Sequence, residues 1–155
     1  MPSEFPAFIT YGEGQHSRNE HFLPPADGAT ELHYGHLVIA AEGAETVARA
    51  ASPAINVIGL SEVDSSKAKL LTPHGMIPIR LISTGAVIVF SSDTDPVIAD
   101  HLNSEVGIVY DADTDNYKVD PAGTGWRVVR LDVPEGRWYC TPIAAALAPS
   151  GGLAS

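Results

Sequence analysis

The chain has 155 residues, which is enough for one ordinary domain but short for two. Nineteen acidic residues against nine basic ones give a formal net charge of −10, which argues against direct binding to nucleic acid. The single cysteine, Cys140, excludes an intramolecular disulfide framework. The longest apolar runs are far shorter than the ~20 residues of a membrane-spanning helix, so we expect a soluble protein with no membrane partner.

Residues 1–32 differ in composition from the remainder of the chain. They contain four prolines and three glycines and show no sustained strand or helix period. Proline removes a backbone donor, so this stretch is not expected in a central strand or a long helix. We predict an extended N-terminal arm that either becomes ordered on a neighbouring protein or wraps around its own domain. Its candidate contact residues are Phe5, Phe8, Ile9, Tyr11, Phe22 and Leu23.

Residues 33–141 read as a mainly β domain, in which short β-branched runs alternate with turn residues. Several such strands at this spacing predict a compact β-barrel or sandwich of short antiparallel strands. The run Ala86–Phe90 is apolar throughout, so we expect it to be buried on both faces or to lie in an interface. The expected strands are His36–Ala41, Ala54–Leu60, Met76–Ser83, Ala86–Ser91, Val106–Asp111, Tyr117–Asp120, Trp126–Asp132 and Arg137–Thr141.

One short helix is expected near residues 95–103. There an acidic residue that can cap a helix precedes Pro96, whose missing N–H costs nothing at the first helical position. Residues 44–51 are compatible with either a short helix or an irregular strand. Residues 142–155 are small and rich in glycine and alanine, and they predict a flexible C-terminal tail, frayed or packed on a neighbour.

The sequence offers no common catalytic motif. It has no nucleophile elbow, no P-loop and no glycine fingerprint after a predicted strand. Cys140 lies on a predicted strand without the signature of a thiol enzyme, so we expect a buried small hydrophobe. We therefore predict neither an enzyme nor a cofactor.

Two histidines raise the alternative of a metal-binding barrel of the cupin kind. His33, His36 and Glu42 have roughly the spacing of such a ligand set, and His74 is a distant candidate for a fourth ligand. On a strand, however, residues three apart point to opposite faces, so His33 and His36 are not expected to converge. The sequence therefore predicts no metal site here, and the metal-barrel enzyme stays the less favoured alternative.

The acidic segment 111–116 resembles the start of a calcium-binding loop. The resemblance fails at the sixth position, where Asn116 replaces glycine, and at the twelfth, where Ala122 replaces glutamate. Asp and Asn also bond their own backbone in tight turns, so ordinary turn chemistry is the expected role of these residues.

Three segments in order carry a resemblance to a known family. They are GHLVIAA at Gly35–Ala41, AINVIGL at Ala54–Leu60 and GIVYDADTDNYKV at Gly107–Val119. Their order and spacing resemble the small β-barrel decoration proteins, also called cement or head-stabilising proteins, of tailed-phage capsids. The resemblance extends over roughly residues 35–132.

The resemblance implies a non-enzymatic virion protein on the outer capsid surface, made in the host cytoplasm. It implies a homotrimer at local threefold positions that binds the major capsid protein and stabilises the head. In this interpretation the six apolar residues of the arm contact the capsid or a neighbouring subunit. Another virion structural module, from a tail or a head fibre, is the alternative.

Overall fold

A computed structural model describes residues 4–10, 19–25, 30–40, 46–67 and 76–147. Within these ranges the chain is mainly β, as predicted, with eleven strands, one short α-helix and two 3₁₀ turns. The strands are β1 (Phe8–Ile9), β2 (Asn19–Phe22), β3 (Leu37–Ala40), β4 (Val47–Arg49), β5 (Val57–Ser61), β6 (Ile77–Leu81), β7 (Ile88–Phe90), β8 (Glu105–Asp111), β9 (Asn116–Asp120), β10 (Trp126–Asp132) and β11 (Arg137–Pro142). The helix is α2 (Ile98–His101), and the 3₁₀ turns are η1 (Ser65–Lys67) and η3 (Ala144–Ala146).

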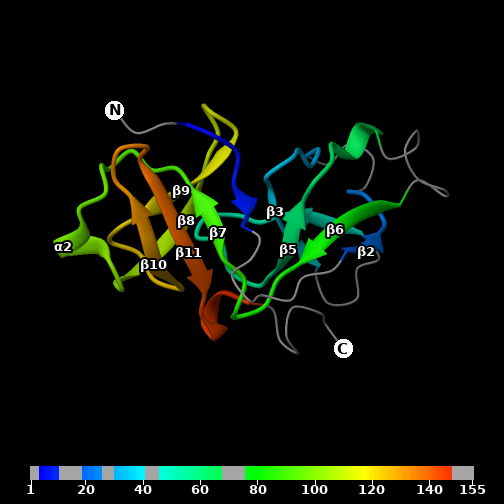
Figure 1. The fold of residues 1–155 in the computed structure, drawn as a ribbon. Helices are drawn as coiled ribbons and strands as arrows, with labels where there is room; N and C mark the ends of the chain where they lie inside the picture. Colours follow the sequence, from blue (N-terminus) through cyan, green and yellow to red (C-terminus); the bar gives the residue numbers. More distant parts are fainter. Residues whose placement is uncertain (1–3, 11–18, 26–29, 41–45, 68–75, 148–155) are drawn as a thin grey trace.

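The strands form two antiparallel sheets that lie side by side in Figure 1. A six-stranded sheet has the order β1-β7-β11-β10-β8-β9, and a five-stranded sheet has the order β2-β6-β5-β3-β4. Every strand pairing within the two sheets is antiparallel, as the short connections between most of the strands favour. The expected barrel or sandwich thus takes the form of two adjoining sheets.

The two sheets repeat one topology. If the strands β2 to β6 are numbered one to five along the chain, their order across the sheet is 1-5-4-2-3. The strands β7 to β11, numbered in the same way, have the same order across their sheet. In each sheet an isolated parallel bridge joins the first and third strands of this series. Leu23, after β2, bridges to Thr46, before β4, and Ser91, after β7, bridges to Lys118 on β9. Each sheet therefore curls back on itself. A repeated order with a repeated closure is the pattern that an internal duplication leaves.

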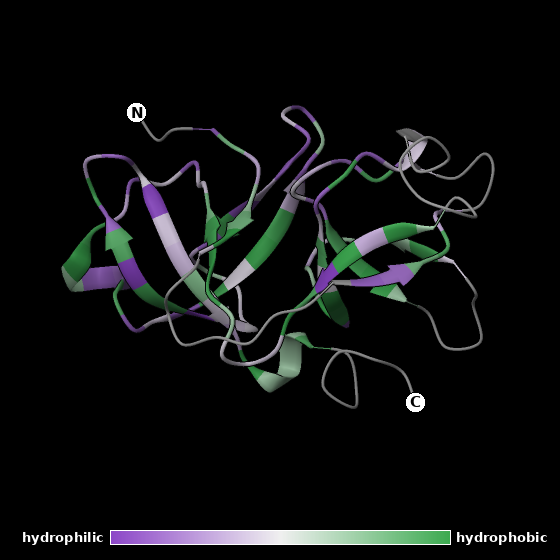
Figure 2. Ribbon diagram, turned by 45° about the vertical axis from the view of Figure 1, so that its right-hand side comes forward, coloured by the Kyte–Doolittle hydropathy of each residue, from purple (hydrophilic) through white to green (hydrophobic). Residues whose placement is uncertain are grey.

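Two hydrophobic clusters, one on each face of the five-stranded sheet, explain why its strands are apolar at successive positions. Successive side chains of a strand point to opposite faces. On β5, Leu60 joins a large cluster shared with the six-stranded sheet, whereas Ile58 joins a smaller cluster on the opposite face. The larger cluster also holds both tryptophans and Cys140, which is buried as predicted. Figure 2 shows apolar residues along the strands of both sheets.

All eight strands expected between residues 36 and 141 are present, with small shifts of their ends. Residues 88–90 are fully buried, as the apolar run predicted. The undecided segment 44–51 contains a strand, β4. The helix lies where it was expected, but its start differs. Val97 is the N-cap residue and no side chain caps the helix; instead the Val97 N–H donates to Nδ1 of His101 at 2.9 Å.

Two described N-terminal segments, 8–9 and 19–22, pair with strands of the body. β1 pairs with β7, and β2 pairs with β6, each on the outside of its sheet. The prolines thus kept these segments out of central positions but did not prevent short edge strands. At the other end, the described part of the expected tail is partly packed: Ala146 and Leu147 are buried and Leu147 bridges to Val57, whereas Ala144 and Ala145 are exposed.

Candidate functional site

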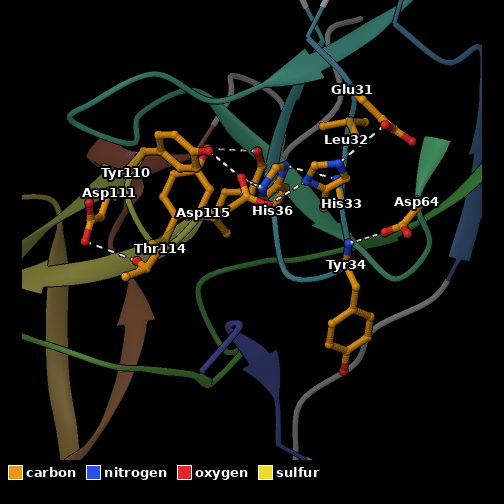
Figure 3. A network of polar contacts seen from close by, with 12 residues as sticks. Glu31, Leu32, His33, Tyr34, His36, Asp64, Tyr110, Asp111, Thr114 and Asp115 are labelled. Atoms are coloured by element: carbon orange, nitrogen blue, oxygen red, sulfur yellow. Dashed lines mark hydrogen bonds and ion pairs between the residues drawn. The ribbon is translucent and has the colours of Figure 1, made fainter. Parts of the chain in front are cut away.

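A turn brings two of the sequence-predicted histidines together. Gly35 adopts a φ of +86°, a left-handed conformation that favours glycine, and reverses the chain just before β3. The rings of His33 and His36 consequently lie with their centroids 5.1 Å apart (Figure 3). The expectation that these rings point to opposite faces was wrong, because the two residues belong to a turn and not to a strand.

Asp115, which is distant in sequence from the two histidines, completes the cluster. It lies in the turn between β8 and β9 with a φ of +58°, and its carboxylate reaches back to the histidine turn. One carboxylate oxygen lies 2.6 Å from Nδ1 of His33, and the other lies 2.9 Å from Nε2 of His36. The Tyr110 hydroxyl donates a further hydrogen bond to the same carboxylate. Asp115 therefore joins the two sheets at this point.

The hydrogen bonds fix the proton on His36. The backbone N–H of His33 donates to Nδ1 of His36 at 3.0 Å, so that nitrogen carries no hydrogen. The hydrogen of the neutral ring must then be on Nε2, where it is donated to Asp115. Burial disfavours the charged ring and lowers the pKa of His36, in spite of the neighbouring carboxylate.

The surroundings of His33 favour its charged form. Its Nδ1 faces Asp115, and its Nε2 lies 3.4 Å from a carboxylate oxygen of Glu31. The hydrogen bond with Asp115 outweighs desolvation and raises the pKa of His33. Burial acts to raise the pKa of Asp115, but hydrogen bonds from Tyr110, His33 and His36 bring it below its usual value. The centre of the cluster is thus an ionised carboxylate held by three donors.

Aromatic rings surround the cluster on its inner side. The rings of Tyr110 and Tyr117 both meet the His36 ring edge to face. The buried Tyr117 hydroxyl donates to the backbone carbonyl of Ala50, which again connects the two sheets. The Arg49 guanidinium lies 3.8 Å from the centroid of the Tyr110 ring, a cation–π contact.

The cluster has the composition of a metal site but not the proton arrangement of one. Ligand atoms of His33, His36 and Asp115 lie within 4.8 Å of one another. A metal at Nε2 of His36 needs a lone pair there and a hydrogen on Nδ1. A hydrogen on Nδ1 would point at the backbone N–H hydrogen of His33 and would replace the hydrogen bond between them with a repulsive contact. The geometry therefore favours a hydrogen-bonded network over a metal centre. Glu42 and His74, the other ligands considered from sequence, lie outside the described residues.

Asp111 shows the turn chemistry predicted for the acidic hairpin, whereas Asp115 of the same hairpin instead bonds the two histidines. The N–H of Asp113 donates to the Asp111 side chain at 3.0 Å, and the Thr114 hydroxyl donates to it at 3.1 Å. Asp111 also pairs with the buried Lys118 at 2.8 Å. Its carboxylate is therefore already satisfied inside the hairpin.

Five of the six residues predicted as capsid or subunit contacts are described, and they differ in burial. Ile9 is buried in the larger core cluster, and Phe22 packs against the smaller one. Phe5 and Phe8 are half-buried, with ring centroids 5.8 Å apart, and Leu23 is exposed. Tyr11 lies outside the described residues. Ile9 and Phe22 thus stabilise the fold itself.

Comparison with known proteins does not assign the chain to a family. The scan against protein-family models and the search of curated proteins each found no match to the chain. In the part of the chain that the structure describes, no helix has the length and apolar character needed to cross a membrane.

Proposed function

We propose that this chain is a capsid decoration protein of a tailed phage, which binds the major capsid protein on the outer surface of the head and stabilises the shell without catalysis. The observation that carries the proposal is the order and spacing of three segments, Gly35–Ala41, Ala54–Leu60 and Gly107–Val119. In the fold they supply β3, β5 and the β8–β9 hairpin. His36 of the first segment and Asp115 of the third are hydrogen-bonded to each other.

The chemistry of the described residues is compatible with this role. The most elaborate polar cluster joins two sheets and keeps its protons in internal hydrogen bonds, which is what a stabilising network does. The strong negative charge keeps many copies soluble before assembly. On a shell, repeated weak contacts raise avidity by about 10²–10⁴ without a stronger single contact. A homotrimer matches the threefold positions of such a lattice.

The test is a binding measurement with shells that lack the protein. Purified chain is mixed with expanded and with unexpanded shells of the major capsid protein, and bound protein is measured by co-sedimentation. We expect saturable binding in a multiple of three copies, and light scattering of the free protein should give the mass of a trimer. Failure to bind either form of the shell would refute the proposal. A reconstruction that places the protein on a tail or head fibre would identify a different virion module.

A further inference from the structure

The short helix α2 and its flanks expose three large apolar side chains, which we call the α2 patch: Val97, Ile98 and Leu102. Their exposed fractions are 45%, 57% and 39%. No residue of the helix is buried. The helix lies at the far end of the six-stranded sheet, away from the five-stranded sheet (Figure 1). A short helix that has no buried residue and exposes its apolar side chains is a candidate contact surface.

The patch is held in place by its neighbours. The His101 ring lies 4.7 Å from the buried Trp138 ring. The N–H of Asn103 donates to the carbonyl of Val128 on β10 at 2.9 Å, and the Ser104 hydroxyl donates to the carbonyl of His101 at 2.6 Å. The C-terminal side of the segment is thus fixed to the sheet. A contact made by a fixed segment loses little conformational entropy on binding.

Two acidic side chains lie beside the patch, and the Arg127 guanidinium donates to the carbonyl of Asn103 just after it. Asp95 precedes it and Asp100 lies within the helix, and both are exposed. Two copies of the chain meeting patch to patch would bring these carboxylates together, in a molecule whose net charge is already −10. The same charge opposes binding to an anionic lipid surface. The complementary partner is a protein surface with an apolar pocket bordered by lysine or arginine.

We propose that the α2 patch docks into such a basic-rimmed apolar pocket on the major capsid protein. The inference rests on the proposed function and assigns its contact surface to α2 rather than to the N-terminal residues. Ile9 and Phe22 of that earlier set are engaged in the chain's own cores, whereas the α2 side chains are exposed. Three side chains form a small contact, and a lattice compensates by offering many identical pockets.

The experiment compares two variants with the wild-type chain in the shell-binding assay. The test variant is Ile98→Ser with Leu102→Ser, and the control is Ile55→Ser, which removes an apolar side chain of 47% exposure before β5. Because none of these side chains is buried, thermal unfolding should change little in either variant. We expect the test variant to bind shells at least about tenfold more weakly and the control to bind within about twofold of wild type. Asp95→Asn with Asp100→Asn should flatten the salt dependence of binding.

The outcomes separate the two proposals. If the wild-type chain binds no shells, the proposed function fails and the docking surface fails with it. If the wild-type chain binds and the test variant binds equally well, only the docking surface is refuted. A wild-type oligomer that the test variant dissociates in analytical ultracentrifugation would instead identify a second copy as the occupant. Binding to zwitterionic lipid vesicles that is lost in the test variant would identify a membrane, and either result overturns the inference.

Discussion

Asp115 accepts hydrogen bonds from His33 and His36 in one turn and from Tyr110 on β8. Its own backbone adopts a left-handed conformation. Asparagine tolerates that conformation at least as well, so Asp115→Asn removes the charge without straining the turn. Hydrogen bonds to charged groups contribute about 1.5–3 kcal/mol when buried. Since the Asp115 side chain is 41% exposed, solvent reduces this value, and we expect a loss of about 1–2 kcal/mol.

Urea denaturation measures this loss of unfolding free energy. The control is Asp113→Asn in the same turn, because the Asp113 side chain is exposed and only its backbone N–H is bonded to Asp111. The control should change stability by less than about 0.5 kcal/mol. Equal effects of the two substitutions would mean that the network contributes nothing beyond general charge.

The raised pKa of His33 predicts a pH-dependent contribution to stability. A group with a raised pKa in the folded state stabilises the fold below its ordinary value, 6.5, and this contribution disappears as the pH rises through the folded-state pKa. Glutamine keeps a donor for Asp115 but carries no charge. The stability difference between wild type and His33→Gln should therefore be largest between pH 3.8, the ordinary value for an aspartate, and pH 6.5, and should shrink at higher pH.

The lowered pKa of His36 acts in the opposite direction. It reduces stability as the pH falls below 6.5, but it does so in both proteins and largely cancels in the comparison. Denaturant titrations at a series of pH values give the difference directly. A difference that grows above pH 6.5 would show that His33 is neutral in the fold.

The proton on Nε2 of His36 leads to a prediction about metals. Protein purified without chelator and then dialysed should contain far less than one equivalent of zinc, nickel or manganese by elemental analysis. Added zinc should leave its unfolding midpoint nearly unchanged, because binding would break the His33 N–H bond to His36. One tightly held ion per chain that is lost in Asp115→Asn would contradict this proton assignment and revive the metal-barrel alternative.

At the scale of elements, the turn at Gly35 positions both histidines and also contacts the N-terminal segment. A Cβ at Gly35 would lie 2.7 Å from Cβ of Pro6 and 3.1 Å from backbone atoms of Ala7. Gly35→Ala combines this clash with a disfavoured φ, so we expect a loss of about 2–4 kcal/mol. Gly85→Ala is the matched control: a Cβ there has no described neighbour within 4 Å, apart from the adjoining residues.

Thermal or urea unfolding of the two glycine variants makes the comparison. The control should stay within about 0.5 kcal/mol of wild type. If Gly35→Ala were equally mild, the contact between the turn and residues 6–7 would not contribute to stability.

Sequence patterns predicted the strands correctly where the residues of the strand and of its flanking turns determine the conformation. The eight runs of alternating or continuous apolar residues all became strands. Two strands were missed because they are two and four residues long and lie among prolines, so that their pairing with β7 and β6 decides their conformation. Long-range pairing of this kind overrides local propensity.

The candidate site was missed for a similar reason. His33 and His36 were recognised, but their arrangement depends on whether residues 33–36 form a turn or a strand. Asp115 is 79 and 82 residues away from them in sequence, in a hairpin whose acidic residues have a sufficient local explanation. Only the meeting of the two sheets selects Asp115 from the nineteen acidic residues.

At the scale of the whole molecule, the repeated topology raises the question of whether the two sheets unfold separately. Both tryptophans, Trp126 and Trp138, lie on strands of the six-stranded sheet, so fluorescence reports on that sheet and on the shared core, whereas far-UV circular dichroism reports on the strands of both sheets. The larger core cluster takes residues from both sheets, including Leu60 of β5. We therefore expect one cooperative transition with the same midpoint by both signals.

Two substitutions on β5 sharpen this test. Leu60 faces the shared cluster and Ile58 faces the cluster confined to the five-stranded sheet, and both are almost fully buried. Replacement by alanine should cost about 2–5 kcal/mol at either position. If the molecule is one cooperative unit, Ile58→Ala lowers the fluorescence midpoint as much as the circular dichroism midpoint, although no tryptophan belongs to its cluster. An Ile58→Ala variant with an unchanged fluorescence transition would show that the two sheets are independently stable units, because the shared core would then not transmit the loss.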